Sequence, residues 1–125
     1  MATVLETSIR TAQIQDIITA AGANAKLKLY DGAMPSGGGA PAGTLLATLT
    51  GSTVIGTASG GVLNWDEAGF TQNNATHVTG TPTFVRITTS ADAFVMDTSD
   101  ATVTGTVTTG VDVTFNTSTT TAGNA

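Results

Sequence analysis

Threonine limits the possible folds of this chain more than any other feature, because 27 of its 125 residues are Thr. Thr is branched at Cβ, so it fits the half-exposed surface of a pleated sheet better than a helix interior. A mean hydropathy of +0.20 also argues against a disordered chain. We therefore expect a mainly β fold with an uncharged but well-hydrated surface.

The size and residue usage of the chain exclude several classes of protein. A length of 125 residues suits one compact domain. No apolar run approaches the roughly 20 residues of a membrane span, and the N-terminal residues lack the basic and apolar regions of a secretion signal. We expect neither a membrane protein nor an exported one. The absence of cysteine removes disulfides, thiolate catalysis and zinc sites built on Cys.

Charge is scarce and mainly negative. The formal net charge is -5 and the pI is about 4.3. The positive side chains are Arg10, Lys26, Lys28 and Arg86. Proteins that bind DNA or RNA gain much of their affinity from basic side chains that release counter-ions from phosphates. We therefore expect no nucleic-acid partner.

Residues 8–21 have the apolar spacing of a helix, and Gly22 supplies a left-handed stop. One face gathers Ile14, Ile17, Ile18 and Ala21. The nearly opposite face holds Leu5, Ile9 and Ala12. Three interpretations remain open: a helix between the body and a second partner, a helix over residues 11–21 after an extended arm, and a helix packed on its own sheet with a frayed start.

Period-two patterns then indicate short strands. Leu27 and Leu29 alternate with other side chains over residues 26–30, and the strand stops at Asp31. Gly and Pro make residues 33–43 an exposed loop.

A second strand is predicted over residues 44–50, continued by residues 53–57 beyond a bulge at Gly51. Its inward side chains would be Leu45, Ala47 and Leu49. The next predicted segments are a short strand over residues 62–65, a polar connection over residues 71–76 and a strand that begins at Val78.

A β-hairpin is predicted further along, with strands over residues 83–89 and 93–97. One face of its first strand would hold Phe84, Arg86 and Thr88, and the other Val85 and Ile87. In residues 103–115 the large apolar side chains occupy odd positions, which predicts two strands bent around residues 109–110. The side chains expected to point inward are Val103, Val107, Val111, Val113 and Phe115.

These segments together predict an antiparallel β-sandwich or jelly roll of about six to eight short strands with one N-terminal helix. The arm and helix would occupy residues 1–22, and the β body residues 23–116. Residues 117–125 have no core-facing period, so we expect an exposed tail that is ordered only on a neighbour.

Residues that would carry catalysis are few. His77 is the only histidine, and no Gly-x-Ser-x-Gly segment provides a nucleophile for it, so we interpret it as a surface or strand-edge residue. Asp66 and Glu67 are adjacent and would point to opposite sides of a strand, unlike the paired carboxylates of a glycosidase. We expect no enzymatic activity, no small-molecule substrate and no cofactor.

Two ligand-binding patterns are incomplete. Asp92, Asp97 and Asp100 would suit a weak calcium site, but their spacing matches no EF-hand loop, and solvated turn carboxylates are the alternative. Glycines 37–39 superficially resemble a phosphate cradle. No Lys follows them and Pro41 removes a backbone donor, so we interpret the segment as a flexible loop.

An ordered series of short segments resembles a group of small Ala/Thr/Gly-rich proteins that tailed phages and prophages encode among their virion structural genes. The first segments are LYDG at 29–32, MP at 34–35, GTLLATL at 43–49 and ASGGV at 58–62. The later ones are TFVRI at 83–87, VMD at 95–97, TGVDV at 109–113 and TAG at 121–123. The resemblance covers residues 7–123. Similar proteins run on into another apolar strand, so we expect the missing strand to come from a neighbour.

The resemblance implies a virion part, and we expect a capsid decoration or cement protein. Such a protein is made in the bacterial host cytoplasm and binds the outside of the major capsid protein lattice on the phage head. A Thr-rich, weakly charged β domain suits this role because it is soluble and resists aggregation through its sheet edges. The alternative is a tail, baseplate or fibre component involved in host attachment.

We also expect self-association as a homotrimer, because the two-faced helix and the incomplete last sheet leave surface for a symmetric neighbour. The candidate interface residues are Leu5, Ile9, Met34, Trp65 and Phe70. Trp65 keeps a second interpretation as a core anchor, since large aromatic side chains dominate both settings. The terminal segments 2–10 and 117–125 are the expected ties to a neighbour.

Overall fold

The computed structural model describes residues 6–66, 69–98, 106–113 and 119–121, in which one helix precedes a set of short strands. The elements are α1 (Thr7–Ala21), β1 (Lys26–Tyr30), β2 (Leu45–Thr50), β3 (Gly56–Ser59), β4 (Val62–Trp65), β5 (Thr71–Gln72), β6 (Phe84–Thr88), β7 (Phe94–Thr98) and β8 (Thr119–Thr121). Two 3₁₀ turns, η1 (Ser36–Gly38) and η3 (Asn74–Thr76), interrupt the connections. The predicted mainly β fold with one N-terminal helix is confirmed.

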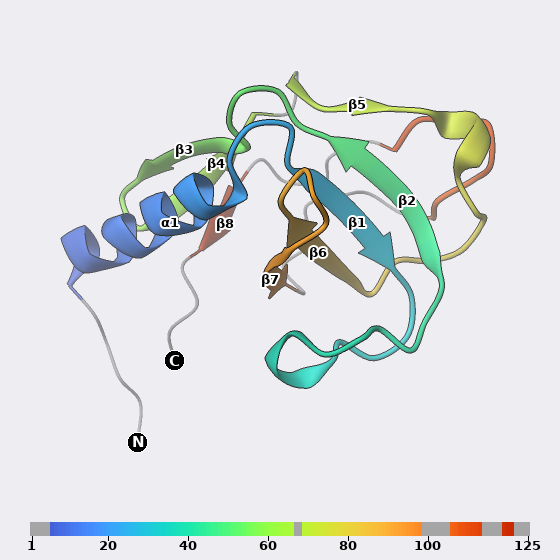
Figure 1. Cartoon of the computed structure of the whole chain (residues 1–125), viewed down its shortest axis with the longest axis horizontal. Coiled ribbons are helices and arrows are strands. Elements are labelled where there is room, and N and C mark those ends of the chain that lie inside the picture. The colour runs from blue at the N-terminus through green and yellow to red at the C-terminus, as the bar shows by residue number, and fades with distance from the viewer. Residues whose placement is uncertain (1–5, 67–68, 99–105, 114–118, 122–125) are drawn as a thin grey trace.

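The strands form two antiparallel sheets (Figure 1). The large sheet has the order β5-β2-β1-β6-β7, and the small sheet has the order β3-β4-β8. Helix α1 lies alongside the small sheet and contacts β3 and β4. The arrangement is sandwich-like, with the helix at one end.

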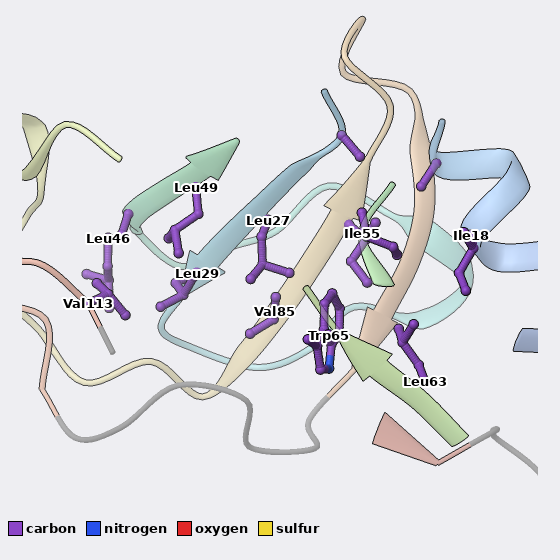
Figure 2. Close-up of a cluster of buried hydrophobic side chains, with 14 of the residues drawn as sticks. Ile18, Leu27, Leu29, Leu46, Leu49, Ile55, Leu63, Trp65, Val85 and Val113 are labelled. Carbon is purple, nitrogen blue, oxygen red and sulfur yellow. The ribbon is translucent and has the colours of Figure 1, made fainter. Parts of the chain in front are cut away.

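The hydrophobic core lies between the two sheets and the helix. Figure 2 shows Ile55 and Trp65 of the small-sheet side facing Leu27 and Val85 of the large sheet, with Leu63 on the side of Ile18. The inner face of the large sheet consists of alternating positions, as the period of two requires. Its fully buried side chains include Leu27, Leu29, Leu49 and Ile87.

Helix α1 begins and ends where the sequence indicates. Glu6 caps it by accepting a hydrogen bond from the Ser8 amide at 2.7 Å, and Gly22, with φ of 71°, closes it by donating to the Ile18 carbonyl. Ile14, Ile18 and Ala21 are buried, whereas Ile9 is 50% exposed. The predicted inward face is therefore confirmed, and the helix begins at Thr7 rather than after an arm that reaches residue 10.

The predicted hairpin is confirmed. Strands β6 and β7 pair antiparallel, and Asp92, with φ of 68°, sits in the turn between them. The register shifts between Ile87 and Thr88, which marks a bulge in the ladder.

The prediction for β2 is wrong at its start. Leu45 is 38% exposed and Leu46 is buried, although simple alternation places Leu45 inside. The register explains the difference: Ala47 pairs with Leu29 and Leu45 pairs with Tyr30, so Leu46 is an extra residue in a bulge. A bulge reverses the inside and outside positions beyond it.

The middle of the chain also differs from expectation. Residues 56–59 do not continue β2 but form β3 in the other sheet, and residues 71–72 form β5 instead of a plain connection. Val78 begins no strand; its amide donates to the Leu46 carbonyl at 2.8 Å.

The predicted strands of residues 103–115 are absent from the part that the structure describes, 106–113. Val107 makes an isolated bridge with Gly80, and Val113 is buried, but Val111 is 56% exposed because it lies in a turn. The predictions for Val103 and Phe115 lie outside the described residues.

The sequence predicts that the C-terminal segment lies outside the strands. This prediction is wrong, because the segment contains strand β8. Thr119–Thr121 pairs antiparallel with β4, with Leu63 opposite Thr120. The small sheet thus takes its third strand from this chain. A run of Thr has no apolar period to reveal it, which is why sequence patterning misses this strand.

Candidate functional site

The outer face of the large sheet, turned away from the core, gathers three of the four basic side chains of the chain and three aromatic rings. Strand pairing fixes its members: Lys28 lies opposite Arg86, and Arg86 lies opposite Asp97. Alternation puts them on the face that Leu27 and Leu29 leave free. We call this surface the outer face, and its members are Lys26, Lys28, Tyr30, Leu45, Phe84, Arg86, Thr88, Phe94 and Asp97.

Arg86 and Asp97 form the centre of the outer face. The guanidinium donates from Nε and Nη2 to the two carboxylate oxygens, each at 2.8 Å. Both side chains are almost fully buried, at 10% and 6% exposure. The hydrogen bonds from the guanidinium to Asp97 raise the pKa of Arg86 above its ordinary value, so the group stays charged.

The loop of residues 33–43 lies over Arg86. Nη2 of Arg86 also donates to the Gly39 carbonyl at 2.7 Å. The Phe94 ring lies over the guanidinium, 4.8 Å from its carbon to the ring centroid, and Gly38 packs against the same ring. The Arg86 guanidinium thus links strands β6 and β7 to the loop of residues 33–43.

The base of this loop is held by hydrogen bonds between side chains and backbone groups. Asp31 accepts a hydrogen bond from the Thr44 amide, and the Thr83 hydroxyl donates to the Gly32 carbonyl. Beside this base, Tyr30 and Phe84 stack with their ring centroids 5.4 Å apart. The loop is therefore bonded to the sheet at both ends and, through the Gly39 carbonyl, to Arg86.

Lys26 and Lys28 share one carboxylate. Both ammonium groups lie 2.9 Å from Oδ1 of Asp92, which the hairpin turn places beside them. Hydrogen bonds from Lys28 and Lys26 lower the pKa of Asp92 to about 2. Asp92 is therefore counted with the outer face, where three cations and two carboxylates leave a net positive charge.

The predicted interface residues do not come together in one patch. Ile9 on α1 is 50% exposed and Met34 in the loop is 46% exposed. Trp65 is 5% exposed and its ring centroid lies 6.2 Å from that of Phe70, so Trp65 is a core anchor and Phe70 packs against the core. Leu5 lies outside the described residues.

Sequence reasoning missed Phe94 and Leu45 as exposed apolar residues of the outer face, at 45% and 38% exposure. The signal for Phe94 is present in the hairpin: it pairs with Thr88, which shares a face with Arg86 in the predicted alternation. Leu45 carries no such signal, because the bulge that turns it outward depends on strand pairing.

His77 is buried at 3% exposure, so its assignment to the surface or a strand edge is wrong. Its Nε2 lies 2.8 Å from Oε1 of Gln72, an oxygen that only accepts, so Nε2 carries the proton. The Gln72 amide also bonds both backbone groups of Val113: Oε1 accepts from its amide at 2.8 Å, and Nε2 donates to its carbonyl at 3.1 Å. His77 therefore orients the glutamine that holds the 106–113 segment.

The acidic residues proposed for calcium are occupied by cations of the protein. Asp92 is bound by two lysines and Asp97 by Arg86, while Asp100 lies outside the described residues. Across residues 6–66, 69–98, 106–113 and 119–121, no group of three or more His, Asp or Glu side chains would hold a metal ion. Asp66 accepts a weak hydrogen bond from the Ser52 hydroxyl, and Glu67 is outside the described residues.

Two shallow hollows adjoin the outer face at β2. Their volumes are about 270 and 370 Å³, and both are lined by Thr48 and Thr76. The linings are hydroxyl, amide and aliphatic groups without a charged side chain. Such surfaces offer contact area and hydrogen bonds but no acid or base.

No helix in the described part of the chain is long and apolar enough to cross a membrane. Comparison with protein-family models, with curated proteins and with solved structures finds no match to this chain.

Proposed function

We propose that this chain is a non-enzymatic structural protein of a bacteriophage virion. In this proposal it binds the major capsid protein lattice from outside, as a homotrimeric decoration protein that stabilises the phage head. In this proposal the protein is made in the cytoplasm of the host cell and acts on the surface of the phage head.

The observation that carries the proposal is the ordered series of segments similar to small virion proteins of tailed phages. In the folded chain four of these segments fall on strands of the large sheet, while MP, ASGGV and TGVDV lie in or across loops and turns. LYDG ends β1, GTLLATL enters and covers most of β2, TFVRI contains most of β6, and VMD lies within β7. The similarity therefore follows the large sheet itself.

The exposed surface supports a binding role. Met34, Leu45 and Phe94 are large apolar side chains with 38% to 46% exposure, on the outer face or in the loop above it. Exposed apolar side chains among polar ones are typical of protein contact surfaces. The surrounding Thr hydroxyls keep such a surface hydrated when it is free.

Stoichiometry on purified particles tests the proposal. Virions produced by cells that carry this gene are purified, and the ratio of this chain to the major capsid protein is measured by quantitative mass spectrometry. We expect a copy number of the order of the capsid lattice. A few copies per particle, in multiples of three or six, would instead support the tail, baseplate or fibre alternative, and absence from particles would refute a virion role.

A further inference from the structure

Charge is distributed unevenly over this molecule. Three of its four cations, Lys26, Lys28 and Arg86, lie on the outer face with the carboxylates of Asp92 and Asp97. That leaves the outer face one net positive charge, although the whole chain has a net charge of -5. The other acidic residues that the structure describes are not members of this face; they are Glu6, Asp16, Asp31, Asp66 and Asp112. The fourth cation, Arg10, lies on α1, so the described part of the protein has one weakly positive surface and elsewhere five carboxylates against one cation.

The outward side of α1 is part of the acidic surface. Glu6, Ile9, Gln13 and Asp16 follow one another at intervals of three or four residues, so they form one stripe along the helix. All four are exposed, and the core contacts are made by Ile14 and Ile18 on another side. Two carboxylates about 15 Å apart thus flank Ile9, given a rise of about 1.5 Å per residue.

Glu6 is ionised in this position. Hydrogen bonds from the Ser8 hydroxyl and amide hold the pKa of Glu6 below its ordinary value. Asp16 is also exposed, so the stripe presents two carboxylates and one exposed apolar side chain, with Arg10 one turn from Glu6 beside it.

The outer face has the complementary pattern. Phe94, with 45% exposure, lies over Arg86 and opposite Thr88, which in turn lies opposite Lys26 on the next strand. The lysines keep part of their surface, with side-chain exposures of 29% for Lys26 and 17% for Lys28. Because the two ammonium groups share Oδ1 of Asp92, they form one cationic group that a single carboxylate of the stripe can meet, with the two apolar side chains next to each other.

We propose that the α1 stripe of one copy docks on the outer face of a second copy, with Ile9 against Phe94 and one carboxylate of the stripe toward the Lys26–Lys28 pair. The two surfaces differ, so the contact is head-to-tail rather than two-fold, and the homotrimer requires that its rotation close into a ring of three. Pairing either surface with itself would bring like charges together. This contact rests on the homotrimer of the proposed function and needs no capsid.

Complementation between two blocked variants tests this contact. The helix variant carries Ile9→Lys and Asp16→Lys, and the face variant carries Phe94→Glu. Gln15→Lys, on an exposed part of α1 outside the stripe, is the matched control for added charge. Circular dichroism and thermal unfolding establish that each variant is folded, and Phe94→Ser replaces Phe94→Glu if the latter does not fold.

Light scattering and native mass spectrometry give the assembly mass. We expect the parent and Gln15→Lys to have three times the 12.4 kDa mass of one chain, and each blocked variant to associate at least roughly tenfold more weakly. Mixing the two blocked variants should produce a one-to-one dimer, because one intact helix and one intact face remain. Added salt should weaken the parent ring.

Three results would overturn the contact: a monomeric parent, a mixture that stays monomeric, or a blocked variant that keeps the parent mass. These outcomes are separate from the proposed function. A ring in solution from a protein absent from virions would leave the contact standing, whereas a monomer that coats the head would refute only the contact.

Discussion

Arg86 of β6 and Asp97 of β7 lie opposite each other and form a two-bonded ion pair with both distances at 2.8 Å. The pair is buried on the face of the large sheet that turns away from the core, under the loop of residues 33–43. It therefore connects an edge strand, its neighbour and a long loop in one arrangement.

Loss of the Asp97 charge should destabilise the fold. Breaking a buried ion pair by removing one partner costs about 3–5 kcal/mol, and the amide that Asp97→Asn introduces still accepts one hydrogen bond, so we expect the free energy of unfolding to fall by about 3 kcal/mol. Chemical denaturation measures this free energy of unfolding. The double change Arg86→Met with Asp97→Leu should recover much of this loss, since it removes both charges. A stability loss below about 0.5 kcal/mol for Asp97→Asn would contradict a buried, bonded pair.

The pH dependence should reveal the carboxylate shared by two lysines. The pKa of Asp92 is about 2 in the folded protein and 3.8 is its ordinary value. Because the folded value is the lower one, the stabilising contribution is complete above the ordinary value and is lost as pH falls toward 2. An NMR titration of the Asp92 carboxyl carbon should have its midpoint near pH 2. A midpoint near 3.8 would mean that the lysines do not bind it, and Asp92→Asn should remove the transition.

The Gln72 amide should control the segment that contains Val113. Gln72→Glu removes the donor to the Val113 carbonyl, and one such bond is worth about 0.5–1.5 kcal/mol. We expect faster hydrogen exchange of the Val113 amide and a small loss of stability. The exposed Gln15→Glu serves as control and should change neither. Unchanged exchange at Val113 would show that Gln72 does not hold this segment.

Gly56 should tolerate no side chain. A Cβ at this strand position would overlap the backbone carbonyl of Asn64 on the paired strand. Backbone cannot yield as a flexible side chain does, so Gly56→Ala should cost about 3 kcal/mol. Gly60 has open space around it and φ of 60°, so Gly60→Ala should cost only about 1 kcal/mol, from the left-handed conformation. Equal thermal stability of the two variants would contradict the pairing of β3 with β4.

The parts of the fold that local patterns specify were predictable. The inward face of α1 follows the helical period, and the alternation in β1 and the β6–β7 hairpin follows the period of two. These features depend on residues that lie close together in the sequence, so sequence patterns alone predict them.

Features that depend on distant partners were not predictable. Leu46 replaces Leu45 inside because β2 pairs with β1 through a bulge, and His77 is buried because Gln72 and the 106–113 segment pack around it. Strand β8 forms only against β4. The sequence predicted Met34 and Ile9 as interface residues, and both are exposed. Phe94 could be placed on the outer face only from the register of β6 and β7.

A cryo-electron microscopy map of the virion tests the central claim most directly. We expect density for this β domain on the outer surface of the capsid lattice, repeated over the head, with the helix of one copy against the large sheet of the next. Density confined to the tail or baseplate, or particles without this chain, would contradict a decoration role.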